Sequence, residues 1–120
     1  MAHILVVDDS PTEIHVCKTI LEKNGHQVTT AQSGEEGVEV AKKVLPDLIL
    51  MDVVMPGLNG FQATRQLSNE PSTSGIPVVI VTTKDQETDK VWAMRQGAKD
   101  YIVKPVKEKD LLDRVKALVG

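Results

Sequence analysis

The sequence has very little cysteine: Cys17 is the only one among 120 residues. One cysteine cannot form an internal disulfide, and it cannot build a metal site made of several cysteines. This composition fits a protein of a reducing compartment. Because an unpaired cysteine usually behaves as a small hydrophobic core residue, we expect Cys17 to be buried.

Long apolar runs and an excess of basic residues are also missing. No run approaches the roughly 18 apolar residues that a membrane span needs, and the Met-Ala-His start enters a predicted strand instead of a charged signal-peptide segment. We therefore expect a cytoplasmic protein without a membrane partner. The net charge is −3, with no basic stripe of the kind that nucleic-acid binding needs, so we expect no nucleic-acid partner.

Internal repeats and low-complexity segments are absent as well. With 120 residues and 41% hydrophobic content, the chain has the length of one domain and enough apolar material for one packed core. We predict a single domain over residues 1–120, with no room for an output domain.

Five short aliphatic or β-branched runs alternate with longer segments of helical period. This alternation is typical of repeated βαβ units around a parallel sheet, so the predicted fold class is α/β. The runs cover residues 4–7, 27–30, 48–51, 78–81 and 101–103. The first, third and fourth are almost wholly apolar, which predicts central strands buried on both faces. The second is half polar and suits an edge.

The first two helices have recognisable start signals. Ser10 and Glu13 form one predicted capping box, with a proline at the first helical position between them, and Ser33 and Glu36 form another. The first helix is expected to stop at Gly25, a residue free to take a positive φ.

The remaining helix signals are apolar stripes and breakers. The apolar face of the second helix is predicted to run through Leu45 until Pro46 ends it. A third helix is expected after Gly60, a fourth over residues 86–96, and a fifth with an apolar stripe over residues 111–119.

Chemically active groups stand directly after four of the predicted strands. Asp8 and Asp9 follow the first strand, Asp52 the third, Thr82 the fourth and Lys104 the fifth. Ligands of an open α/β sheet bind outside the carboxyl ends of its strands, so we expect these groups to share one rim. Singly, each has a structural explanation: an acid caps the next helix, a threonine hydroxyl bonds to backbone, and a lysine is a solvated cation.

The three acids together favour a metal site. Converging carboxylates repel one another, so they destabilise a fold unless a cation neutralises them or some become protonated. Oxygen ligands without a histidine or cysteine cluster suit Mg²⁺, which keeps several waters and commonly shares its coordination with phosphate. The sequence therefore predicts a Mg²⁺ site, with Mn²⁺ as an alternative ion.

Lys104 is followed by Pro105, and an X-Pro bond just after a strand is a candidate for a cis linkage. As a set, the rim offers a carboxylate nucleophile, metal ligands, an ammonium group and a hydroxyl. These are the groups that phosphoryl transfer to an aspartate requires.

With these residues in place, the sequence resembles the receiver domains of two-component response regulators over essentially its whole length. The resemblance lies in Val-Val-Asp8-Asp9-Ser-Pro, Leu-Met-Asp52-Val-Val-Met-Pro56-Gly-Leu-Asn-Gly60, Val-Thr82-Thr, Gly97-Ala and Tyr101-Ile-Val-Lys104-Pro105. It implies a flavodoxin-like, doubly wound fold with five parallel strands in the order 2-1-3-4-5 and five helices. Periodicity predicts the elements, whereas the strand order comes only from the resemblance.

The resemblance also implies roles for the rim residues. Asp52 would be the phosphoacceptor, Asp9 and Asp52 would bind Mg²⁺ directly, and Asp8 would act mainly through water. The backbone carbonyl of Val54 would be a further ligand. Lys104 would pair with the phosphoryl oxygens.

Switching would start at Thr82, which would move to hydrogen-bond the phosphoryl group while Tyr101 changes rotamer. The surface expected to change includes Lys90, Trp92, Tyr101 and Lys107. We expect Trp92 to be an ordinary packing residue of the fourth helix, and exposure of its ring would instead indicate a partner contact.

Two positions that vary in the family affect how long the phosphoryl group lasts. They are Val54 and Lys84 here, and neither can act as a general base, because one has no titrating group and the other carries an ammonium. We therefore expect slow or moderate self-hydrolysis.

A narrower resemblance, over residues 55–67 and 82–92, is to stand-alone receivers that control type IV pilus twitching motility. The implied partners are a chemotaxis-type histidine kinase as phosphodonor and an unidentified downstream protein, with the chain acting as a monomer. Self-phosphorylation and self-dephosphorylation would be its only activities, so it would not be an enzyme. The alternative function is a phosphate sink for a sister regulator.

Two other classes of protein fit less well. A phosphohydrolase with an aspartate nucleophile needs a second acid close after the first, usually as Asp-x-Asp, and Asp52-Val-Val lacks it. A flavin-binding electron carrier needs a phosphate loop rich in hydroxyl groups and glycine after the first strand, and Asp8 and Asp9 would repel the phosphate there.

Overall fold

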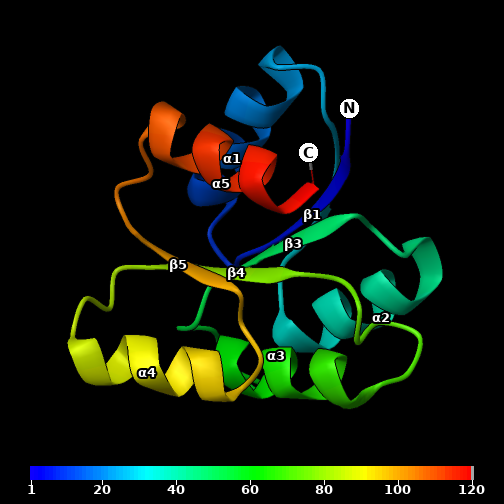
Figure 1. Ribbon diagram of the computed structural model, residues 1–120, viewed down its shortest axis with the longest axis vertical. Coiled ribbons are helices and arrows are strands. Elements are labelled where there is room, and N and C mark those ends of the chain that lie inside the picture. The colour runs from blue at the N-terminus through cyan, green and yellow to red at the C-terminus, as the bar shows by residue number, and fades with distance from the viewer. Residues whose placement is uncertain (120) are drawn as a thin grey trace.

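The computed structural model describes residues 1–119, which form a parallel sheet between two layers of helices (Figure 1). The strands are β1 (His3–Val7), β2 (Gln27–Ala31), β3 (Leu48–Met51), β4 (Val78–Thr82) and β5 (Asp100–Val103), in the order β2-β1-β3-β4-β5. The helices are α1 (Pro11–Lys23), α2 (Gly34–Val44), α3 (Gly60–Asn69), α4 (Glu87–Arg95) and α5 (Glu108–Val119). The α/β class, the five strands, the five helices and the strand order are confirmed.

The two faces of the sheet carry separate hydrophobic cores. Leu5 and Val7 of β1 face a core shared with α2, α3 and α4, whereas Ile4 and Val6 face a core shared with α1 and α5. Figure 1 shows these helix layers on opposite sides of the sheet. Because successive side chains of a strand point to opposite faces, a strand covered on both sides must be apolar throughout.

The predicted positions of the strands in the sheet are confirmed. The strands β1, β3 and β4 lie in the centre, and all residues of β3 and β4 are buried. The half-polar β2 lies at an edge, with only Ala31 buried among its residues. Cys17, on the inner face of α1, is 5% exposed, as expected.

The predicted capping boxes of α1 and α2 are only half formed. Each N-cap serine accepts its hydrogen bond, but the predicted return bond from the serine N–H to the glutamate side chain does not form. Ser10 accepts from the backbone N–H of Glu13 at 3.3 Å, but its own N–H donates to the Asp8 carboxylate at 2.9 Å instead of to Glu13. In α2 the Glu36 carboxylate accepts from the N–H of Gln32, at 2.7 Å. Nearby groups therefore compete for the bond that completes each box.

A complete capping box begins α3. Asn59 accepts from the N–H of Gln62 at 2.9 Å, and the Gln62 side chain accepts from the N–H of Asn59 at 3.0 Å. The N-cap residue Asn59 lies one residue before Gly60, the residue after which the third helix was expected.

The prediction that Leu45 continues the apolar face of α2 is wrong. The helix ends at Val44, and Leu45 follows it in the left-handed region with a φ of 47° and an exposed side chain. The next residue, Pro46, disfavours a right-handed helical conformation of Leu45, which explains the early end. Gly25, with a φ of 87°, ends α1 as predicted.

Among the helices of residues 1–119, none has the length and apolar character to cross a membrane.

Candidate functional site

The carboxyl ends of neighbouring strands bring the predicted rim residues together. Hydrogen bonds from Asp52 N to Val7 O, at 2.9 Å, and from Lys104 N to Thr82 O, at 2.8 Å, extend the pairing of the strands just beyond their last residues. Because all five strands are parallel, these ends lie at one edge of the sheet.

The three acids of the rim form a compact cluster. Asp8, Asp9 and Asp52 each offer one carboxylate oxygen, and these oxygens all lie within 4.8 Å of one another. Asp8 and Asp52 are buried, at 5% and 6% exposure, whereas Asp9 is exposed. Converging oxygen donors with one side open to solvent fit a hard cation such as Mg²⁺, which keeps several of its waters.

Lys104 is a buried partner of these acids and not a solvated surface cation. Its Nζ lies 2.7 Å from Asp8 Oδ2 and 3.7 Å from Asp52 Oδ2, with 8% of the side chain exposed. Burial lowers the pKa of Lys104, but the hydrogen bond with Asp8 and the charge of Asp52 outweigh burial and leave the pKa raised. The Lys104–Pro105 bond, which its position made a candidate for a cis linkage, is cis.

The charge of Asp52 is only partly compensated by its surroundings. Burial raises the pKa of its carboxyl group, and the nearby charge of Asp8 raises it further. Three groups oppose this rise without cancelling it: Lys104, the N–H of Val53, which donates to Asp52 Oδ1 at 2.8 Å, and the side chain of Thr82. The site therefore holds more negative charge than its own groups neutralise.

Thr82 and Tyr101 both form hydrogen bonds with the backbone of Lys84, in the loop between β4 and α4. Thr82 is completely buried, and its Oγ1 accepts from the N–H of Lys84 at 3.4 Å. The Tyr101 hydroxyl donates to the carbonyl oxygen of Lys84 at 2.8 Å. Burial, followed by the charges of Asp89 and Asp85, raises the pKa of Tyr101 to about 12. One loop residue thus contacts both side chains that the family resemblance linked.

Val54 lies in the loop that joins β3 to α3, with 58% of its surface exposed. The loop is tied to the start of α3 by a hydrogen bond of 3.0 Å from Gly60 N to Val53 O. Glu35 of α2, a residue that the sequence reasoning missed, accepts from Leu58 N at 3.0 Å. The only sequence signal for Glu35 was its place in the first turn of a helix.

The expectation that Trp92 is an ordinary packing residue is wrong. Its side chain is 50% exposed, and its neighbours Val91 and Met94 are 46% and 49% exposed. The buried apolar contact of α4 is made by Ala93. Lys90 is half-buried and Lys107 is exposed, so these two and Trp92 are the accessible members of the predicted switch and output residues, whereas Thr82 and Tyr101 are buried.

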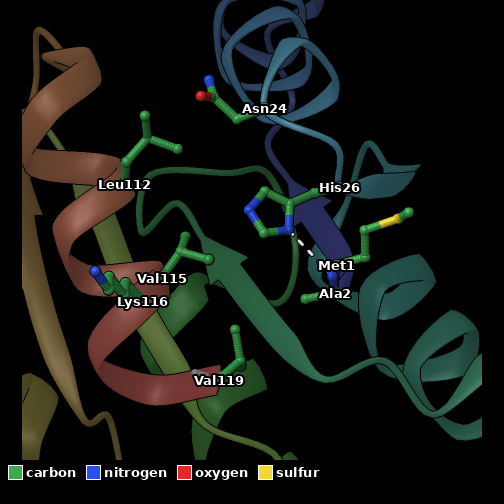
Figure 2. Close-up of a pocket in the computed structure, with 8 residues that line it drawn as sticks. All are labelled: Met1, Ala2, Asn24, His26, Leu112, Val115, Lys116 and Val119. Atoms are coloured by element: carbon green, nitrogen blue, oxygen red, sulfur yellow. Dashed lines mark hydrogen bonds between the residues drawn. The ribbon is translucent and has the colours of Figure 1, made fainter.

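A separate pocket of about 280 Å³ lies at the opposite edge of the sheet, between the start of β1 and α5 (Figure 2). In it, His26 Nδ1 accepts from Ala2 N at 3.1 Å, and Leu112, Val115 and Val119 form an apolar wall. None of the rim residues lines this pocket.

Comparison with known proteins agrees with the geometry of the rim. The family model for the response regulator receiver domain matches residues 4–116. The chain therefore belongs to the response regulator receiver domain family, whose members take phosphate from histidine kinases in two-component systems. Receiver domains bind Mg²⁺ at an acidic pocket, which in this chain corresponds to Asp8, Asp9 and Asp52.

A particular relative is protein PilH of Pseudomonas aeruginosa. It is 61% identical over 120 residues, which cover 100% of this chain and 99% of that protein.

Two solved structures show the same fold. Chemotaxis protein CheY4 of Vibrio cholerae superposes with a TM-score of 0.92 at 30% identity, covering 98% of each chain. The receiver domain of the sensor histidine kinase PA1611 of Pseudomonas aeruginosa has a TM-score of 0.92 at 29% identity, covering 99% of this chain and 97% of that one. The PA1611 domain was solved with a magnesium ion coordinated in its active site cleft.

Proposed function

We propose that this receiver domain is a phosphoacceptor switch in which a phosphoryl group on Asp52 changes binding to a partner protein. The observation that carries the proposal is the convergence of Asp8, Asp9 and Asp52 within 4.8 Å of one another, with the buried ammonium group of Lys104 against Asp8 and Asp52. The excess negative charge of the acids favours binding of a metal ion, and the ammonium group of Lys104 can bind an anionic phosphoryl group.

In the proposed reaction, the Asp52 carboxylate attacks the phosphorus of a phosphohistidine on a histidine kinase. An O–P bond forms on Asp52, and the N–P bond of the donor breaks. The imidazole leaves with the electron pair of that bond and takes up a proton from solvent. The Val53 N–H holds Asp52 Oδ1 at 2.8 Å, which orients the carboxylate with Oδ2 toward Lys104.

The metal would be held by the carboxylates of Asp8, Asp9 and Asp52 and by the backbone carbonyl of Val54, with Mn²⁺ as an alternative to Mg²⁺. When bound, Mg²⁺ neutralises the charge of the acids and of the phosphoryl oxygens. The protein itself supplies positioning and a buried positive charge, so it needs no catalytic output domain.

Switching would follow from a change of partners. Lys104 would leave Asp8 for a phosphoryl oxygen, and the Thr82 hydroxyl would turn from Lys84 toward the same group. Both moves alter the loop to which Tyr101 is bonded, and this loop leads into α4 with its exposed Trp92. A partner that binds α4 would thereby sense the phosphoryl group.

The biological setting that we propose is control of type IV pilus or chemotaxis-like motility, with a chemotaxis-type histidine kinase as donor. The support is the 61% identity to PilH over the whole chain. A phosphate sink would need fast release of phosphate. Neither Val54 nor Lys84 supplies a base for that reaction, which favours a switch.

The decisive experiment is phosphorylation by a small acyl-phosphate donor with Mg²⁺, read by intact mass spectrometry. Wild type should gain one phosphoryl group, and Asp52→Asn should gain none. Labelling should also disappear when all divalent metal is chelated. Asp113→Asn, which removes an exposed acid on α5, serves as the matched control and should label like wild type. Equal labelling of Asp52→Asn and wild type would disprove the assignment.

A further inference from the structure

The first turn of α2 lies against the loop between β3 and α3. The Glu35 carboxylate accepts from Leu58 N at 3.0 Å. Next to this bond, Gly57 has a φ of 73°, and a Cβ atom added there would lie 2.7 Å from Glu35 Oε2. The carboxylate is therefore seated directly against the loop backbone. Hydrogen bonds from the N–H groups of Glu35 itself and of Leu58 lower the pKa of Glu35, so it accepts them as a carboxylate at neutral pH.

The contact between α2 and this loop is also close at the backbone. A Cβ atom added to Gly34 would lie 2.3 Å from the carbonyl oxygen of Leu58. One turn further along α2, a Cβ atom at Gly37 would lie 2.9 Å from the Val7 side chain. Because Val7 directly precedes Asp8, α2 connects the loop to the strand that presents the acids.

The other end of the loop is fixed near the phosphoacceptor. Gly60 N donates to Val53 O at 3.0 Å, and a Cβ atom at Gly60 would lie 1.9 Å from the carbonyl oxygen of Asp52. Residues 54–56 therefore lie between two fixed points of the loop. One is the hydrogen bond at Val53, and the other is the contact of Gly57 and Leu58 with Glu35. Within residues 1–119, Glu35 is the only side chain outside this loop and α3 that accepts a hydrogen bond from the backbone of residues 53–59.

We propose that Glu35 is a positioning residue for the metal site: by holding Leu58, it fixes the loop that carries the Val54 carbonyl and so raises Mg²⁺ affinity. This inference rests on the proposed function, which places that carbonyl among the metal ligands. Glu35 does not touch the metal and acts through the loop backbone.

The chemistry of the two common divalent ions gives the proposal a specific signature. Mg²⁺ demands a nearly ideal octahedron, whereas Ca²⁺ accepts varied geometry and longer bonds. A loop that has lost its anchor should therefore weaken Mg²⁺ binding more than Ca²⁺ binding. Loss of a negative charge near the site should instead weaken the binding of both ions by similar factors.

The test is a titration of the full chain with Mg²⁺ and with Ca²⁺, followed through the backbone NMR signals of the acid cluster. Glu35→Ala removes the acceptor, Glu35→Gln removes the charge but keeps a carbonyl acceptor, and Glu39→Ala removes an exposed acid one turn further along α2. Glu35→Ala should weaken Mg²⁺ binding about tenfold, the lower end of the range for residues that orient a metal ligand. Its loss of Ca²⁺ affinity should be clearly smaller.

Glu35→Gln and Glu39→Ala should stay within about twofold of wild type, a range that marks small outer charge effects. Unchanged Mg²⁺ affinity in Glu35→Ala would overturn the inference. Equal losses in Glu35→Ala and Glu35→Gln, or equal losses for both ions, would assign the effect to charge and overturn it as well.

Failure of the proposed function would look different, because wild type itself would then bind no Mg²⁺ at the acid cluster. Because the Glu35 side chain is exposed, its truncation leaves the core intact, and a thermal melt of each variant verifies folding.

Discussion

At the scale of single residues, the central feature is a buried lysine that lies closer to one acid of the site than to another. Lys104 Nζ is 2.7 Å from Asp8 but 3.7 Å from Asp52. Asp8 thus takes the direct bond, and Asp52 keeps a raised pKa because burial and the Asp8 charge outweigh its own compensating contacts. The charge of Asp52 is therefore only partly compensated within the folded protein.

Asp52→Asn should therefore stabilise the metal-free protein. Asparagine keeps an oxygen for the Val53 N–H and leaves the Lys104–Asp8 pair intact, while it removes the repulsion with Asp8. We expect the metal-free melting temperature to rise by a few degrees, since about 1 kcal/mol corresponds to roughly 4 °C in a domain of this size. The exposed Asp9 should give a smaller rise in Asp9→Ala.

The pH dependence of this gain has a definite sign. A carboxyl group with a raised pKa in the folded state stabilises the fold below its unfolded value of 3.8, and this contribution is lost as pH rises through the folded value. The gap between Asp52→Asn and wild type should thus be smallest at acidic pH and widen toward neutral pH. Thermal melts across this range would measure it. A lower melting temperature of Asp52→Asn at neutral pH would show that the acids are structurally satisfied.

At the scale of elements, the loop between β4 and α4 is the structural link from the site to α4. Its residue Lys84 is bonded to both the Thr82 hydroxyl and the Tyr101 hydroxyl, at 3.4 Å and 2.8 Å. A movement of Thr82 would therefore be expected to displace the backbone at Lys84, and with it the start of α4 and the Tyr101 side chain of β5. Phosphorylation adds a charge of about −1.5 to −2, and new bonds must form to hold it.

The beryllofluoride mimic of the phosphoryl group should shift backbone NMR signals from Thr82 to Lys107 far more than signals along α2. The physical reason is that the mimic draws Thr82 and Lys104 away from their present partners and favours a minor conformation by a few kcal/mol. Thr82→Ala should abolish the distant shifts, whereas Thr83→Ala, which changes an exposed neighbour, should preserve them. Shifts confined to the acid loops would contradict the switch.

At the scale of the whole molecule, the acid cluster couples ion binding to folding. Two neighbouring strands, β1 and β3, present the acids of the cluster, and the separated groups of an unfolded chain cannot form the site. A ligand present at about 100 times its Kd stabilises the folded state by about 2.7 kcal/mol.

Mg²⁺ should accordingly raise the melting temperature of wild type in a concentration-dependent way, as mass action requires. The rise should be much smaller in Asp9→Ala and Asp52→Asn, which lose a ligand, and unchanged in Asp113→Asn. A monovalent salt at equal ionic strength controls for general screening. Equal shifts in all four proteins would place the effect outside the acid cluster.

Much of the fold could be predicted from the sequence because its signals are local. Aliphatic or β-branched runs predicted every strand to within about a residue at each end, a precision that boundaries seldom reach. Composition placed β2 at an edge, and Gly25 marked the end of α1. The rim also followed, since acids at the ends of parallel strands must share an edge. The strand order, by contrast, came only from family resemblance.

The tertiary structure alone decided which groups pair across the rim and between elements. Lys104 bonds to Asp8 across 96 positions of sequence, and Glu35 reaches Leu58 from another helix. The same competition for partners took the Ser10 N–H from Glu13, and the small contact of α4 through Ala93 left Trp92 exposed. Such outcomes depend on distances between segments that are remote in the chain. A sequence pattern records the period and the polarity of each segment but not the distance from one segment to another.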